Sequence, residues 1–188
     1  MHTMDTRGRR FVSCLLLFAL LASCLPFTAS RQLHLGQCVI NVHTQELKQY
    51  FSEIRQSMLT EDSHMGLRLL KSHTMKDVQP TESCCFLRML LRFYVERVFS
   101  SYSTGQSHVR RSTSNLANSF LSIKKDLRQC LQHAHMQCHC HEHTSHKFAD
   151  IQASFDKLNQ KEGAVKAMGE LDSLLDWLDG FHHLRHHS

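Results

Sequence analysis

The chain has 188 residues, of which 41% are hydrophobic and 21% are charged, with 22 Lys and Arg against 17 Asp and Glu. This length is enough for one domain with a hydrophobic core of its own. The charge is only mildly basic and forms no Lys/Arg stripe, which argues against nucleic acid as a partner.

The first 30 residues have the pattern of a secretory signal peptide. Arg7, Arg9 and Arg10 precede an apolar run at 11–25, and small residues follow it up to Ser30. The run is shorter than the roughly 20 residues that a membrane-spanning helix needs. We therefore expect cleavage after Ser30 and a secreted, extracellular protein without membrane insertion. An uncleaved N-terminal anchor is the alternative.

The rest of the chain predicts an all-α fold. Apolar residues recur at steps of three and four, which places them on one face of a helix. We expect five or six helices and no strand. The main helices are expected at about 41–59, at 84–100, from 115 up to the cysteines that follow 130, at 148–158 and at 164–179.

The segments between these helices are long and polar. The linker 61–79 contains two helical turns around 67–70, and a second linker covers 101–111. Thr81 or Ser83 is expected to cap the next helix, residues 159–163 to break one, and Gly180 to end the last. Linkers of this length permit a bundle with crossover connections.

Six cysteines remain after residues 1–30 are removed. An even number in an exported chain indicates disulfides, and six cysteines allow fifteen pairings. Neighbouring cysteines on a helix do not easily bond each other, and two cysteines two residues apart would close a cramped ring. The most economical pairing is Cys38–Cys130, Cys84–Cys138 and Cys85–Cys140.

Metal binding is the alternative interpretation of the same region. Residues 138–143 read Cys-His-Cys-His-Glu-His, a run rich in ligands for Zn²⁺ or Cu²⁺. Disulfides would consume the thiolates, so we expect no metal and no cofactor. We interpret residues 182–188 as a disordered His-rich tail whose charge rises near pH 6. No catalytic motif is present, and we expect no enzyme activity.

Several ordered motifs resemble the interleukin-10 family of class II helical cytokines, and within it the branch of interleukins 19, 20 and 24. The resemblance covers essentially all of 33–178. The motifs that carry it are LGQCVI at 35–40, FSEIR at 51–55, the Cys pair at 84–85, LLRFYVERVF at 90–99, LANSFLSIKKDLR at 116–128, HAHM at 133–136, CHC at 138–140 and GELD at 169–172.

The resemblance implies a monomeric domain at 31–181 with six to seven helices and three disulfides in the pairing given above. It implies a cytokine that brings together two class II receptor chains, of the interleukin-20 receptor alpha and beta type, with the interleukin-22 receptor alpha type as a further partner. Janus kinase signalling in epithelial and immune cells would follow. The loop 131–137 is two residues longer than the interleukin-20 pattern.

The resemblance also suggests where receptors bind. The first helix, the connection after it and the last helix usually form one receptor face, and the first and middle helices contribute to the other. The exposed positions that we expect to contribute are Gln49, Ser52, Glu53, Arg55, Gln56, Arg68, Lys71, Lys76, Lys166 and Glu170. For any one of these residues we favour an ordinary solvated position, and we expect some members of the set to be contacts, because interfaces concentrate their binding energy in a few anchors. A secreted metal-binding or antimicrobial helical protein, or a carrier with a central apolar cavity, are the alternative functions.

Overall fold

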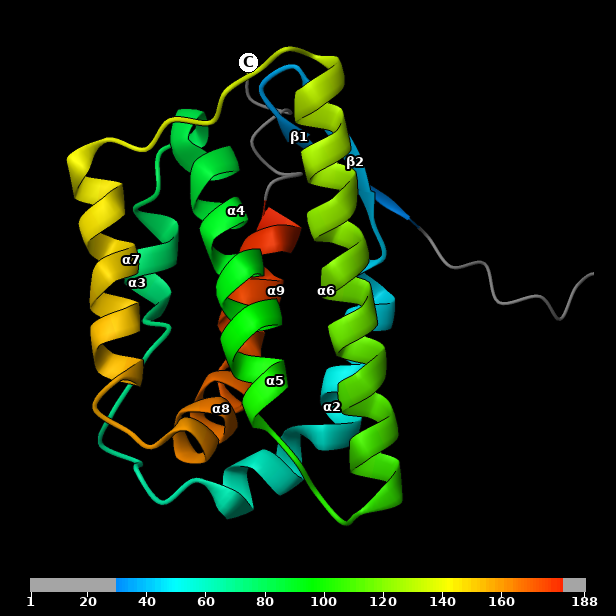
Figure 1. The fold of residues 1–188 in the computed structure, drawn as a ribbon, viewed down its shortest axis with the longest axis vertical. Coiled ribbons are helices and arrows are strands. Elements are labelled where there is room, and N and C mark those ends of the chain that lie inside the picture. The colour runs from blue at the N-terminus through cyan, green and yellow to red at the C-terminus, as the bar shows by residue number, and fades with distance from the viewer. Residues whose placement is uncertain (1–29, 181–188) are drawn as a thin grey trace, which may run out of the picture.

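A computed structural model of the chain describes residues 30–180 (Figure 1). The expected signal peptide, apart from Ser30, and the expected tail at 182–188 lie outside these residues. The elements in chain order are β1 (Arg31–Leu35), β2 (Cys38–Val42), α2 (Thr44–Glu61), α3 (Ser72–Lys76), η1 (Pro80–Glu82), α4 (Ser83–Phe93), η2 (Tyr94–Val98), α5 (Phe99–Ser101), α6 (Ser107–His133), α7 (Glu142–Phe155), α8 (Gln160–Gly169) and α9 (Leu171–Gly180).

The prediction of a helical bundle is confirmed. In Figure 1, α4, α6 and α7 run roughly side by side, α9 lies behind α4, and α8 crosses the lower end of the bundle. Helix α4 and the last helix are central: Phe86, Leu87 and Leu90 of α4 and Leu171 and Leu174 of α9 have no exposed surface. Within residues 30–180 no helix combines the length and apolarity that crossing a bilayer requires.

The prediction that the chain has no strand is wrong. Strands β1 and β2 form an antiparallel hairpin in which Leu35 pairs with Cys38. Gly36 makes the tight turn with a φ of 67°, a conformation that suits glycine. Buried and exposed residues alternate along β2, with Cys38, Ile40 and Val42 buried. This period of two was present in the sequence, but five residues were too few to distinguish a strand from the entry to a helix.

Several predicted boundaries are also wrong. Residues 67–70 are not helical, and the short helix α3 follows them instead. Helix α6 begins at Ser107, inside the expected linker 101–111. The predicted helix 164–179 is two helices that meet at Glu170. Near each of these boundaries a polar group bonds to a residue distant in sequence; Ser112 of α6, for example, donates a hydrogen bond to Glu53. Local sequence patterns do not predict such partners.

The structure also tests the predicted start of α4 and the predicted break at 159–163. Neither Thr81 nor Ser83 caps α4, because a short 3₁₀ turn, η1, leads directly into it and no side chain bonds its first N–H groups. The break expected at 159–163 is a single cap: the Asn159 side chain accepts a hydrogen bond from the Glu162 N–H at 2.9 Å, and α8 starts at once.

Three disulfides join the elements, as expected from the cysteine count. They connect β2 to the end of α6 and the first turn of α4 to the segment before α7. The bonded pairs are Cys38–Cys130, Cys84–Cys138 and Cys85–Cys140, with Cα–Cα distances of 5.7, 5.6 and 5.6 Å. These distances are typical of disulfides. Because the bonds close loops of more than fifty residues, they restrict the unfolded chain strongly.

Gly163 permits a close contact between α8 and α7. A Cβ at this position would lie 2.9 Å from Cε2 of Phe155, a ring that is buried in the core. We predict that Gly163→Ala lowers the free energy of unfolding by about 1–3 kcal/mol, because the overlap outweighs the better helix propensity of alanine. Urea unfolding measures the change.

Gly169→Ala on the same helix is the matched control. Its Cβ would meet only Met58 at 3.6 Å, an ordinary contact. We expect it to leave stability unchanged or to raise it slightly. Equal effects of the two substitutions would contradict the steric explanation.

Candidate functional site

Helix α2 presents a continuous polar stripe to solvent. Its buried face carries Leu47, Phe51, Ile54 and Met58. The sequence-predicted residues Gln49, Ser52, Glu53, Arg55 and Gln56 are all exposed. This division follows from the three-four spacing of the apolar residues, which directs the intervening polar residues outward.

The stripe has two flanks that lead to different neighbours. On one flank Arg55 approaches Asp172 of α9 at 4.0 Å, and Lys48 lies 3.3 Å from Asp176. On the other flank Glu53 accepts a hydrogen bond from Ser112 of α6. Helix α2 therefore forms the border between two surfaces rather than the centre of one.

The first surface contains a groove between the connection after α2 and helix α9. The groove has a volume of about 430 Å³, and its lining includes Arg68, Lys76, Asp172 and Trp177. Trp177 is partly exposed and packs edge-on against Phe86, with ring centroids 5.6 Å apart. An aromatic anchor beside charged residues has the composition of an interaction surface.

The second surface contains a groove between α2 and α6. Its volume is also about 430 Å³, and polar side chains such as His43, Tyr50, Asn118 and Ser122 line it. The Tyr50 hydroxyl donates a 2.5 Å hydrogen bond to Glu46. Sequence reasoning missed these α6 residues, because polar residues on a long helix look like a uniformly solvated face.

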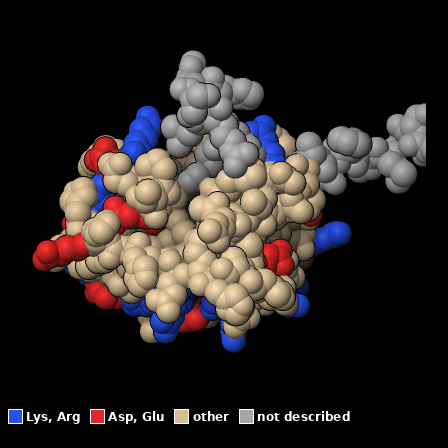
Figure 2. Space-filling view, turned by 90° about the horizontal axis from the view of Figure 1, so that it is seen from above, with Lys and Arg blue, Asp and Glu red and all other residues tan. Residues whose placement is uncertain are grey.

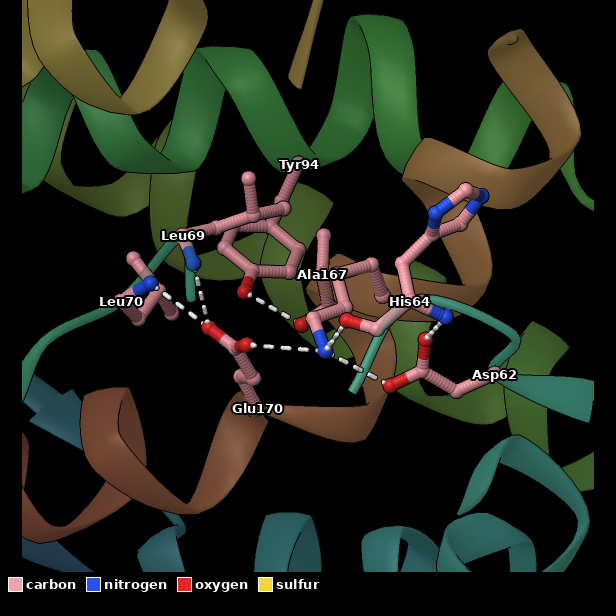
Figure 3. Close-up of polar contacts among 8 residues, drawn as sticks. Asp62, His64, Leu69, Leu70, Tyr94, Ala167 and Glu170 are labelled. Atoms are coloured by element: carbon pink, nitrogen blue, oxygen red, sulfur yellow. Dashed lines mark hydrogen bonds and ion pairs between the residues drawn. The ribbon is translucent and has the colours of Figure 1, made fainter. Parts of the chain in front are cut away.

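The prediction that Lys166 and Glu170 are exposed is wrong: both are buried, with 5% and 7% of their surface exposed. The Lys166 ammonium donates to Asp62 Oδ2 and to the His64 carbonyl, both at 2.7 Å. It also lies 3.7 Å from Glu170 Oε1. Figure 3 shows the Glu170 and Asp62 carboxylates facing this ammonium from opposite sides.

The buried Glu170 fixes the connection that carries the predicted cations. Its Oε2 accepts hydrogen bonds from the backbone N–H groups of Leu69, at 2.9 Å, and Leu70, at 2.7 Å. These two residues separate Arg68 from Lys71, both of which are exposed as predicted. Glu170 and Lys166 therefore position a candidate surface from inside the protein instead of contributing to it.

The network shifts the pKa values of its carboxyl groups in opposite directions. Burial raises the pKa of Glu170, and the bonds from Leu70 and Leu69 oppose this shift only partly. Burial alone would also raise the pKa of Asp62, but hydrogen bonds from Lys166 and the His64 N–H lower it below its usual value. Beside the network, burial raises the pKa of Tyr94 well above normal, and its hydroxyl donates to the Ala167 carbonyl at 2.9 Å.

The described residues do not combine into a metal centre. Between residues 30 and 180 no group of three or more His, Cys, Asp or Glu side chains could hold a metal ion. All six cysteines after the expected signal peptide are in disulfides, so their thiolates are not available as ligands.

A helical domain held by disulfides, with grooved and charged outer faces, is the architecture of a helical cytokine. The family model described as Interleukin 10 matches residues 10–183, and the chain belongs to this family. Mouse interleukin-20 is 46% identical over 155 residues, which cover 82% of this chain and 87% of that protein. The protein is an interleukin-20-like cytokine and not an enzyme, and the resemblance seen in the sequence is confirmed.

Solved structures agree with this assignment. The crystal structure of human interleukin-19 matches with a TM-score of 0.66 at 31% identity, over 73% of this chain and 88% of that one. The structure of an edited human interleukin 24 matches with a TM-score of 0.67 at 35% identity, over 79% of this chain and 97% of that one.

The buried network yields a stability prediction. Lys166→Met leaves the carboxylates of Asp62 and Glu170 without their shared cation, and we expect a loss of about 3 kcal/mol in the free energy of unfolding. Lys161→Met, at an exposed position of the same helix, should change stability by less than about 0.5 kcal/mol. Chemical denaturation of both variants measures the difference. Similar losses in the two variants would show that the network contributes no specific stability.

The raised pKa of Glu170 yields a pH prediction. Its contribution to stability is complete below the unfolded value of 4.5 and is lost as pH rises through the higher folded pKa. Glu170→Gln keeps an acceptor for the connection but does not titrate. On acidification from pH 7 to 4.5, wild type should therefore gain stability relative to this variant. A constant difference in unfolding free energy across this range would contradict the assignment.

Proposed function

We propose that the protein is secreted and signals by bringing together two class II cytokine receptor chains, of the interleukin-20 receptor alpha and beta type. The interleukin-22 receptor alpha type is a further candidate partner. Janus kinases bound to the receptors inside epithelial and immune cells would then be activated. The protein acts as a monomer in this proposal. Secretion is supported by the pattern of residues 1–30 and by three disulfides, which persist in oxidising compartments.

One observation carries the proposal: α2 lies between two separate grooves of different composition. The groove beside α9 has cations, carboxylates and an indole at its border, whereas the groove beside α6 is lined mainly by neutral polar groups. Different surfaces select different partners, because affinity depends on a few well-matched anchors. A rigid ligand with two such faces can hold two receptors at a fixed separation.

The first face combines α2, the connection and α9, as the family resemblance suggests. Arg55, Arg68, Lys71 and Lys76 place four exposed cations on this side. Such charges mainly steer the approach of a partner and select against partners of like charge. We therefore assign to this face a receptor with an acidic binding surface, and to the α2–α6 groove the second receptor.

Charge reversal tests the assignment of the first face. We expect Arg55→Glu combined with Lys71→Glu to weaken binding of one receptor ectodomain at least tenfold, because attraction becomes repulsion, and to leave the other unchanged. Surface plasmon resonance with each ectodomain measures this. Lys157→Glu, an exposed cation after α7, is the matched control and should be neutral for both receptors.

A substitution in the second groove completes the test. Asn118→Arg places a bulky charge between α2 and α6, and we expect it to weaken the other receptor selectively. Loss of the same receptor in both variants, or unchanged binding of both receptors to both variants, would contradict the two-face proposal.

A further inference from the structure

A third groove lies between α4 and α6, away from both faces described above. It has a volume of about 700 Å³, which is within the usual range for sites that hold small molecules. Its lining includes Leu91, Leu127 and Leu131, all buried, and the half-buried Met89 and Met136. The groove is thus apolar at its base. In Figure 1, α4 and α6 run next to each other at the front of the bundle.

The rim of this groove is basic. Arg88 and Arg92 of α4 and Lys124 and Arg128 of α6 border it, together with His135. Figure 2 looks down on the end of the bundle, and its lower edge is this same side. Several Lys and Arg side chains project there, whereas the centre of the view is mostly uncharged.

Two of the four rim cations already share one acidic partner. Glu96 accepts hydrogen bonds from Arg92 and Lys124, both at 2.8 Å, and these bonds hold the pKa of Glu96 below its usual value. Within the described part of the chain, Arg88 and Arg128 are not within ion-pair distance of any carboxylate. The groove therefore carries two uncompensated guanidinium groups above an apolar floor.

The position of these two cations sets them apart. Some cations elsewhere pair with acids across helices, as Lys48 does with Asp176 and Arg97 with Asp156 at 2.6 Å, and others project from exposed helix faces. Arg88 and Arg128 instead border a groove with buried leucines at its base. A guanidinium binds a carboxylate through two parallel hydrogen bonds. The apolar floor beneath Arg88 and Arg128 would simultaneously bury a hydrocarbon chain, at roughly 0.8 kcal/mol for each methylene group removed from water.

We propose that the α4–α6 groove binds a single-chain fatty carboxylate. The hydrocarbon chain lies along Met89, Leu127 and Met136, and the carboxylate lies between Arg88 and Arg128. A sulfated polysaccharide would satisfy the cations but would leave the apolar floor exposed, and for this reason we favour the amphiphile. The groove shares no residue with the predicted receptor contacts, so this site goes beyond the proposed signalling function.

Calorimetric titration with decanoate, below its micelle concentration, tests the site. We expect saturable binding of one decanoate per protein. Butyrate, with the same head group and a short chain, and decyltrimethylammonium, with the same chain and the opposite charge, should each bind at least tenfold more weakly. Equal binding of decyltrimethylammonium would overturn the role of the cations, and equal binding of butyrate would overturn the role of the floor.

Variants locate the binding within the molecule. Arg88→Gln combined with Arg128→Gln should weaken decanoate binding at least tenfold, while Arg110→Gln combined with Lys125→Gln, two exposed cations of α6 outside the groove, should not. Met89→Asp, at a half-buried rather than core position, tests the floor and should also abolish binding; circular dichroism verifies that it folds.

Two further outcomes are decisive. Unchanged decanoate binding in the Arg88 and Arg128 double variant would overturn the proposal, as would binding of a heparin hexasaccharide without binding of decanoate. The double variant should keep the receptor affinities of wild type. Decanoate binding therefore tests the lipid site, and receptor binding tests the proposed function independently.

Discussion

The buried ammonium of Lys166 is the interaction on which the candidate receptor surface depends. It neutralises Asp62 at the end of α2 and approaches Glu170 between α8 and α9, while Glu170 holds the backbone of Leu69 and Leu70. Without an ammonium at this point, the buried Glu170 carboxylate and the partly buried Asp62 carboxylate would lie close together with no cation between them, which is unfavourable. Charge burial thus converts a long, largely irregular connection into a defined part of the surface. Because the network joins segments about a hundred residues apart, it also determines how that connection meets the last helices.

The interior of this domain makes it rigid, and its outer residues are exposed to partners. The disulfides and the core around α4 and α9 fix the positions of the helices. The exposed residues of α2 are then not needed for packing, apart from those at its two flanks that bond to α9 and α6. In the proposed function the protein acts through such surfaces, because they set the distance and orientation of the two receptors. The two grooves beside α2 differ in composition: one is bordered by charged residues and an indole, and the other is lined mainly by neutral polar groups.

The side formed by α4 and α6 has a different character. There the cations exceed the carboxylates, and the single carboxylate of Glu96 is shared by Arg92 and Lys124. The loop 131–137 contributes Met136 to this groove, and Met136 also lies next to Gly36 of the hairpin turn. This loop and the unpaired cations therefore meet at one place, outside the faces that we propose for the receptors.

The sequence by itself determined the helical class, the central position of α4, the six cysteines and the family, because these depend on local periodicity and on ordered motifs. It also identified which α2 residues are exposed. Only the tertiary structure decided that Lys166 and Glu170 are buried, since a charged residue reads as exposed until its partners are known. Their partners, Asp62 and the N–H groups of Leu69 and Leu70, belong to another part of the chain. The same reason explains the break at Glu170, whose carboxylate bonds to a segment about a hundred residues away. The hairpin was missed for another reason: its strands are adjacent in sequence, but five residues each are too few for their period of two to be recognised.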